Sequence, residues 1–89
     1  MNEESGPHIA PEIIWRTLDD NAIVVTPKAG KVRVLNGSGT LIWQMLAENK
    51  SLAAIRESLI TIYEVTPTQA SEDLQSFVSE LTARGLLAW

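Results

Sequence analysis

The chain has 89 residues, of which 45% are apolar and 20% charged, so it can form one small globular domain and is not composed like a disordered protein. Seven basic against eleven acidic residues give a formal net charge of −4, which disfavours nucleic acid and membrane surfaces as partners. Cysteine is absent, which excludes disulfides, thiolate metal ligands and cysteine nucleophiles.

The first residues are acidic and contain no apolar run, and no stretch of about 18 apolar residues follows. We therefore expect neither a signal peptide nor a membrane span, and a cytoplasmic location. Residues 1–11 hold two glutamates, one glycine and two prolines, with little to bury, and are predicted to form a flexible N-terminal tail. Residues 12–89 are predicted to form the single domain.

Three segments rich in Ile and Val follow, at 13–18, 22–26 and 31–35, and turn residues separate them. They predict a three-stranded antiparallel meander whose third strand lies at an edge. In that strand Val32 and Val34 alternate with two cations, which is the period of a half-buried strand, and the valines are expected on the buried side. Leu35 falls on the same side as the cations.

From residue 36 onward the apolar residues recur at helical spacing, which predicts three helices and an α+β fold. The first helix follows the turn at 36–38 and extends for about ten residues. Ser51 can cap the second helix, whose apolar stripe recurs at steps of three and four. The members of this stripe are Leu52, Ile55, Leu59 and Ile62.

The third helix has the strongest start signal of the three. Thr66 can cap it, Pro67 suits its first position, and Gln69 can close a capping box. The helix is expected to run to Arg84, because Gly85 can adopt the left-handed conformation that ends a helix. The apolar residues near the C-terminus are expected to fold back onto the core: Leu86, Leu87 and Trp89.

The side chains that catalysis needs are scarce. The single histidine, His8, lies in the predicted tail, where it is expected to be solvated. Zinc would need four nitrogen or sulfur ligands, and the acidic run at 19–21 is more typical of a tight turn than of a cation site. The glycines at 37 and 39 lack the lysine of a phosphate-binding loop. We therefore expect a protein that is not an enzyme and uses no cofactor or metal.

Three helices beside a small sheet also fit a winged-helix regulator that binds DNA. The third helix, however, presents Glu72, Asp73 and Glu80, and its one basic residue, Arg84, lies at its end. These carboxylates would repel phosphates, so DNA binding is the weaker alternative. A small carrier or metal-handling enzyme subunit is a third alternative, but it would need a reactive His or Cys.

The remaining candidate is a surface for another polypeptide. An edge strand at 31–35 offers unpaired backbone groups to which an extended peptide can add as a further strand. Lys31 and Arg33, facing Asp73 and Glu80 across a groove, would supply both signs of charge and favour one direction of the peptide. Cations on an edge strand also guard against aggregation, so the pattern by itself leaves both interpretations open.

The run LNGSGTLIWQML at residues 35–46 resembles the segment of PqqD-like proteins in which "LN" and small residues precede "IW" and "LL". The resemblance extends over about residues 13 to 88. One departure is the link at 47–50, where family members often have a glycine. The other matching positions are Tyr63, Asp73, Leu74, Phe77, Leu81, Gly85, Leu86 and Leu87.

This resemblance implies a winged-helix-like fold and a non-catalytic recognition element for ribosomally synthesised and post-translationally modified peptides (RiPPs). Such an element binds the leader region of a precursor peptide as an added strand, between its third strand and third helix, and delivers it to a processing or modifying enzyme. The favoured member is the recognition component of lasso-peptide systems, which serves a leader protease. The alternative is PqqD itself, which serves a radical-SAM enzyme in pyrroloquinoline quinone biosynthesis.

Carried over by position, the resemblance also names residues. Ile42 and Trp43 are expected to support the groove from the core behind it. The residues expected to bind the peptide are Lys31, Val32, Arg33, Val34, Leu35, Asp73, Leu74, Phe77, Glu80 and Leu81.

Overall fold

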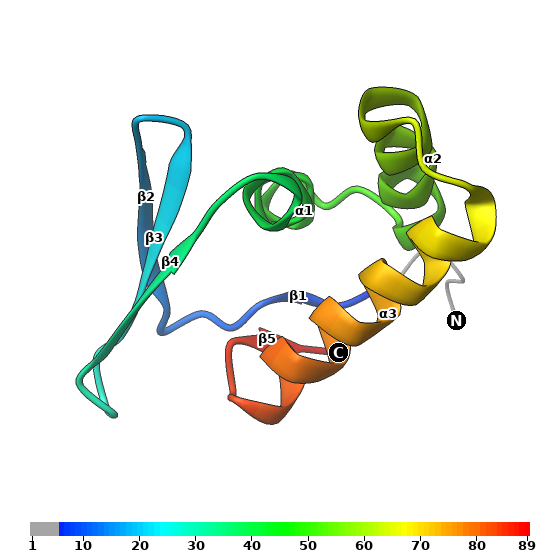
Figure 1. The fold of residues 1–89 in the computed structure, drawn as a ribbon. Coiled ribbons are helices and arrows are strands. Elements are labelled where there is room, and N and C mark those ends of the chain that lie inside the picture. Colours follow the sequence, from blue (N-terminus) through cyan, green and yellow to red (C-terminus); the bar gives the residue numbers. More distant parts are fainter. Residues whose placement is uncertain (1–5) are drawn as a thin grey trace.

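The computed structural model describes residues 6–89, and in it a three-stranded antiparallel sheet is followed by three α-helices (Figure 1). This arrangement confirms the predicted α+β fold. The sheet has the order β2-β3-β4, so β4 lies at an edge, as predicted. The strands are β2 (Ile14–Leu18), β3 (Asn21–Thr26) and β4 (Lys31–Leu35), and the helices are α1 (Ser38–Ala47), α2 (Leu52–Tyr63) and α3 (Pro67–Ala83).

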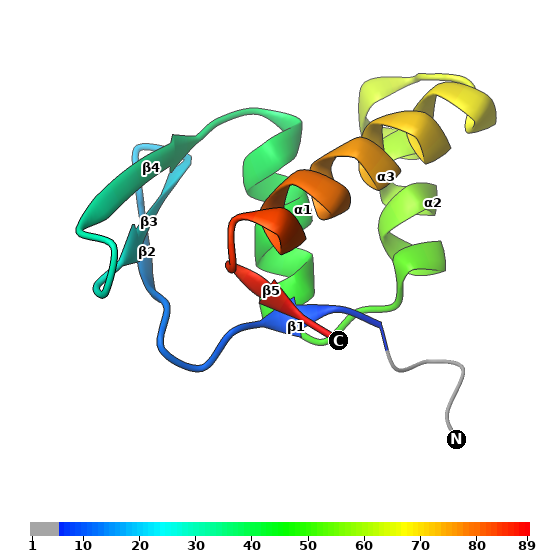
Figure 2. The same cartoon turned by 90° about the horizontal axis from the view of Figure 1, so that it is seen from below.

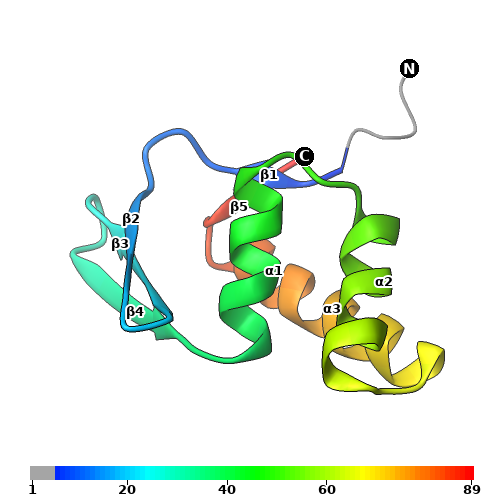
Figure 3. The same cartoon turned by 90° about the horizontal axis from the view of Figure 1, so that it is seen from above.

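Helix α1 lies between the sheet and the other two helices (Figures 1 and 3). It contacts β3 on one side and α2 on another, and α2 packs on α3. The sheet and the α2–α3 pair are therefore held in position through α1.

Residues 6–11 differ from the predicted flexible tail. Strand β1 (His8–Ile9) pairs antiparallel with β5 (Leu87–Ala88), as Figure 2 shows, and the Ala10 N–H donates to the Leu86 carbonyl oxygen at 3.0 Å. Ala10 is buried. The C-terminal strand thus supplies backbone partners that orient this part of the segment. Residues 1–5 of the predicted tail lie outside the described residues.

The C-terminal apolar residues follow the prediction in part. Leu86 and Leu87 are buried, whereas Trp89 is exposed. The Trp89 indole Nε1 donates to the Thr82 hydroxyl at 3.3 Å, so the ring lies along α3 instead of entering the core.

The tight turns use backbone conformations with positive φ. Asp19 and Asp20, at φ 52° and 68°, form the two-residue connection between the paired residues Leu18 and Asn21. Positive φ at both positions is the requirement of a type I′ hairpin turn, and Asp accepts it more readily than most residues. Asn49 has φ 63° in the link where PqqD-like proteins often have glycine, so asparagine supplies the left-handed conformation there.

The predicted start of α3 is confirmed except for the side chain of Gln69. The Thr66 hydroxyl accepts the Gln69 N–H at 3.1 Å, and Pro67 occupies the first turn. The Gln69 side chain does not close a capping box. Its Nε2 donates instead to Asp73 Oδ1 at 2.7 Å, one turn further along the helix.

The end of α3 is a Schellman motif built on Gly85, which has φ 80°. The Gly85 N–H donates to the Thr82 carbonyl at 3.0 Å, and the Leu86 N–H donates to the Leu81 carbonyl at 2.9 Å. The glycine therefore ends the helix where the sequence predicts and turns the chain back towards β1.

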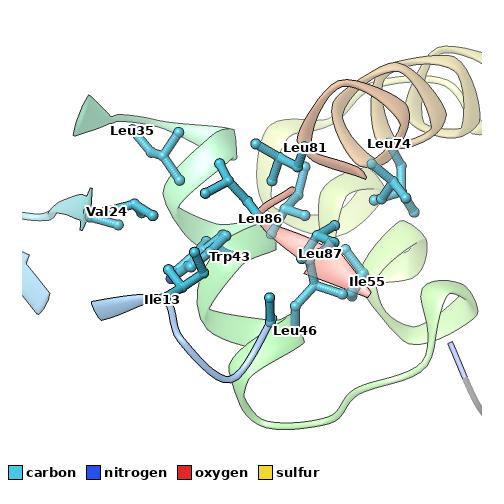
Figure 4. Close-up of a cluster of buried hydrophobic side chains, with 14 of the residues drawn as sticks. Ile13, Val24, Leu35, Trp43, Leu46, Ile55, Leu74, Leu81, Leu86 and Leu87 are labelled. Carbon is cyan, nitrogen blue, oxygen red and sulfur yellow. The ribbon is translucent and has the colours of Figure 1, made fainter. Parts of the chain in front are cut away.

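The core joins the sheet, α1, α3 and the C-terminal segment (Figure 4). Trp43 of α1 is completely buried, and the ring of Trp15 from β2 meets it edge to face, with 6.0 Å between centroids. The Trp43 indole nitrogen has no hydrogen-bond partner among residues 6–89. Ile42 and Trp43 are thus core residues, as the resemblance implies.

The faces of β4 are opposite to the prediction. Val32 and Val34 are 66% and 59% exposed, whereas Leu35 is buried. In the strand register Val24, which is 1% exposed, pairs with Arg33. The side that carries the cations and Leu35 therefore faces the interior. The period of two identifies which residues share a face, but only the packing of α1 decides which face is covered.

A buried hydroxyl joins the sheet to α1. The Ala22 N–H donates to Thr40 Oγ1 at 3.2 Å, and this hydroxyl donates to the Leu35 carbonyl at 2.8 Å. Ala22 and Leu35 are paired residues of β3 and β4. Thr40 therefore satisfies two backbone groups at the end of the strand pair and fixes where α1 leaves the sheet.

The assignment of the sheet faces can be tested by truncating one valine on each side. We expect Val24→Ala to lower the free energy of unfolding by about 2 kcal/mol, because two buried methyl groups are lost. Val32→Ala is the matched control on the neighbouring strand, and we expect it to cost no more than about 1 kcal/mol. Urea denaturation followed by tryptophan fluorescence measures both. An equal loss for Val32→Ala would show that the β4 valines are buried.

Candidate functional site

The site is built from the open edge of β4 and the face of α3 beside it. Along an edge strand, backbone N–H and C=O groups point alternately to the neighbouring strand and away from it. Strand β4 has β3 as its only strand neighbour among residues 6–89. Half of its backbone groups therefore remain available for a further strand.

Two faces of α3 have different roles. Residues at spacings of three and four share a helix face. One face is buried against the rest of the protein and carries Ala70, Leu74, Val78 and Leu81. The other face carries Asp73, Phe77, Glu80 and Arg84, and its charged members are exposed.

An ion pair connects β4 to this second face of α3. Arg33 Nη2 donates to Glu80 Oε2 at 2.6 Å, and the same oxygen accepts Arg84 Nε at 3.2 Å. The hydrogen bond from Arg33 is the main cause that lowers the pKa of Glu80 below its ordinary value, and the charges of Arg33 and Arg84 add to it. Glu80 therefore stays ionised between two guanidinium groups.

A hollow lies at the end of β4 near the β3–β4 turn. Its volume is about 250 Å³, and the buried side chain of Leu86 forms part of its wall. Its other lining residues are Thr26, Ala29, Lys31, Val32, Arg33 and Arg84. Three of these carry positive charge.

The opposite end of this α3 face carries an acidic residue instead of cations. Asp73 lines a separate hollow of about 180 Å³ together with Ser38, the first residue of α1. Between the two ends, a methyl group placed on Gly39 would lie 3.2 Å from Phe77 Cε1 and 3.8 Å from Leu35 Cβ. The absence of a side chain at Gly39 lets the Phe77 ring lie close to α1 and Leu35.

We call the surface between β4 and this face of α3 the β4–α3 groove. Its cationic end holds Lys31, Arg33 and Arg84, and Phe77 and Leu35 lie further along it. Asp73 lies one turn beyond Phe77 on the same face of α3.

The structure brings some of the predicted site residues together and separates others. Lys31, Arg33 and Glu80 meet at the cationic end, whereas Asp73 bonds to Gln69 and does not pair with a cation of β4. Val32 and Val34 offer backbone groups at the edge, but their side chains are exposed on the outer face of the sheet. Leu74 and Leu81 are buried in the core, so their side chains support the groove from behind.

Sequence reasoning missed Arg84, Leu86 and Gly39 as parts of the groove. Arg84 could have been found, because it lies four residues after Glu80 and such pairs meet on a helix. Leu86 and Gly39 gave no such signal, since only the folded chain brings them beside β4 and Phe77.

Residues 6–89 contain no cluster of three or more His, Cys, Asp or Glu side chains that could hold a metal ion. No helix within the same range is long and apolar enough to cross a membrane.

The ion pair predicts how Glu80 titrates. We expect its pKa, measured by carbon-detected NMR, to lie below the ordinary glutamate value and to rise in Arg33→Gln, which removes the principal hydrogen bond. Because the folded-state pKa is lowered, the pair stabilises the fold above the unfolded pKa, and this contribution is lost as the pH falls through the folded pKa. Arg56→Gln, remote from Glu80, is the control. An unchanged Glu80 pKa in Arg33→Gln would contradict the pairing.

Comparisons with known structures agree with this architecture. The structure described as TbiB1 in complex with the TbiA(beta) leader peptide superimposes with a TM-score of 0.86 at 25% identity, covering 90% of this chain and 93% of that one. A lasso peptide synthetase B1 complexed with the leader peptide gives 0.87 at 27% identity, covering 96% and 100%. No curated protein matches the chain significantly in sequence.

The family comparison covers most of the sequence. The profile of coenzyme PQQ synthesis protein D (PqqD) matches residues 21–87, which include β3, β4 and all three helices. With both the fold and this match in agreement with the resemblance seen in the sequence, the chain belongs to the PqqD family.

Proposed function

We propose that this protein recognises the leader region of a ribosomally synthesised precursor peptide and binds it as a fourth strand on β4. The observation that carries the proposal is the open β4 edge beside the charged and aromatic face of α3, in a fold shared with two proteins solved in complex with leader peptides. Backbone pairing along β4 would supply affinity, and the side chains of the groove would supply selectivity.

The geometry of an added strand assigns its side chains to two sides. Successive side chains point to opposite faces of a sheet. One set would enter the β4–α3 groove, beside Arg33, Phe77 and Glu80. The other set would lie on the outer face next to the exposed valines, Val32 and Val34.

The recognition domain acts without catalysis in this proposal and delivers the precursor to a separate enzyme. The similarity to a lasso peptide synthetase B1 favours the lasso-peptide class. In that class, the resemblance seen in the sequence implies a leader protease as the partner. The alternative is a radical-SAM partner in pyrroloquinoline quinone biosynthesis, in keeping with the family description. Co-purification of the chain with each candidate enzyme, with and without the precursor, distinguishes these classes.

DNA binding remains the less favoured function. Glu72, Asp73 and Glu80 are all exposed on α3, where a winged-helix regulator would need basic side chains. A carboxylate-rich helix is repelled by the phosphate backbone.

Replacing Val34 with proline tests strand addition. Proline deletes one backbone N–H of the edge strand and is tolerated in sheets mainly at edges. Peptides covering the first halves of short reading frames beside the gene serve as candidate leaders. We expect calorimetry to show at least about a tenfold loss of affinity in Val34→Pro, since a lost bond and a steric clash exceed 1.4 kcal/mol together.

Val34→Thr is the matched control, because it keeps the N–H and the branched shape, and we expect it to bind like the original protein. Circular dichroism of both variants checks that the fold persists. Unchanged affinity in a folded Val34→Pro protein would reject strand addition on β4.

A further inference from the structure

We propose that the cationic end of the β4–α3 groove is a subsite for an acidic side chain, Asp or Glu, of the bound peptide. This inference rests on the proposed function and adds to it the residue type that the groove selects. Its starting point is the hollow of about 250 Å³ beside Lys31, Arg33 and Arg84.

The local charge at this end is opposite to that of the whole protein. Three cations and the Glu80 carboxylate give the cationic end a formal charge of +2. The chain as a whole carries −4, so the rest of it carries −6. A peptide carboxylate would therefore be attracted to this one end and repelled by much of the remaining surface.

The cations at this end are incompletely satisfied within the protein. All the contacts of Arg33 and Arg84 with Glu80 converge on a single oxygen, Oε2. Each guanidinium has five N–H donors, so both retain donors for a second carboxylate. Lys31 has no carboxylate within ion-pair distance among residues 6–89.

The hollow also has a wall for the aliphatic part of an acidic side chain. Leu86 and Ala29 line it together with the cations. An Asp or Glu side chain entering from an added strand would place its methylene groups against these apolar atoms. Its carboxylate would then reach Lys31 and the free donors of Arg84.

The subsite fixes the register of the peptide. Lys31 and Arg33 lie on the same side of β4, about 7 Å apart along the strand. Asp73, one turn beyond Phe77 on the same face of α3, would repel a carboxylate placed near it. A peptide with one acidic residue on its groove side is therefore held with that residue near the β3–β4 turn.

The test uses a display library of random 16-residue peptides, fused at both ends so that no terminal carboxylate is free, and selected on the immobilised protein. We expect the selected peptides to share an Asp or Glu that lies a constant number of residues from their shared apolar residues. The strongest binder is then synthesised, together with its Glu→Gln and Glu→Lys forms, or the corresponding Asp substitutions.

We expect the Lys31→Glu variant to bind the acidic peptide with at least about tenfold lower affinity than the original protein does. We also expect this variant to bind the Glu→Lys form of the peptide better than the acidic form, which is a charge-swap rescue. Lys50→Glu makes the same change of net charge in the link between α1 and α2 and is the control; it should leave affinity and preference unchanged. Both substituted residues are exposed, and thermal denaturation checks the fold.

The outcomes separate this inference from the proposed function. Binders that are lost in Val34→Pro but lack an acidic residue, or that respond equally to Lys31→Glu and Lys50→Glu, overturn the acidic subsite and leave strand addition standing. Binders that are insensitive to Val34→Pro, or a library without binders, reject the proposed function and the subsite with it.

Discussion

The hydroxyl of Thr40 sets the geometry on which the groove depends. It bonds at once to the Ala22 N–H and to the Leu35 carbonyl, at the end of the β3–β4 pair. The hydroxyl bridges these two paired residues close to the point where the chain leaves the sheet and enters α1, and it contributes a hydrogen bond to each inside an apolar interior. Because α1 packs on α2, and α2 packs on α3, this junction contributes to the placement of β4 relative to the α3 face.

The connection between β4 and α3 is made by side chains, not by a buried hydrogen bond to the backbone. It relies on the Arg33–Glu80 ion pair and on the Phe77 ring beside Gly39. Arg33 is half-buried, and the other charged side chains of the groove are exposed. Exposed ion pairs contribute little to stability and rearrange at small cost. The core therefore maintains the fold, while the groove can adjust its side chains around an added strand without disturbing Trp43 or Leu81 behind it.

Local sequence signals were sufficient for most of the elements. Thr66, Pro67 and Gly85 marked the ends of α3 because caps act through backbone groups within a few residues. The signals failed where the partner is distant. The Gln69 side chain bonds to Asp73 instead of closing the capping box. His8 pairs with Ala88, although the sequence predicted no strand at either end of the chain. The place of Arg84 in the groove could have been predicted from its spacing to Glu80, whereas the places of Leu86 and Gly39 could not.

The sequence by itself determined the order of the three meander strands and the three helices, the edge position of β4 and the family, because these follow from local periodicity, caps and an ordered set of residues. Only the tertiary structure decided which side of β4 faces inward. Period-two alternation is symmetric between the two faces, and the choice was made by α1, which buries Leu35 and leaves Val32 and Val34 exposed. That same choice directs Lys31 and Arg33 into the groove, where Arg33 meets Glu80.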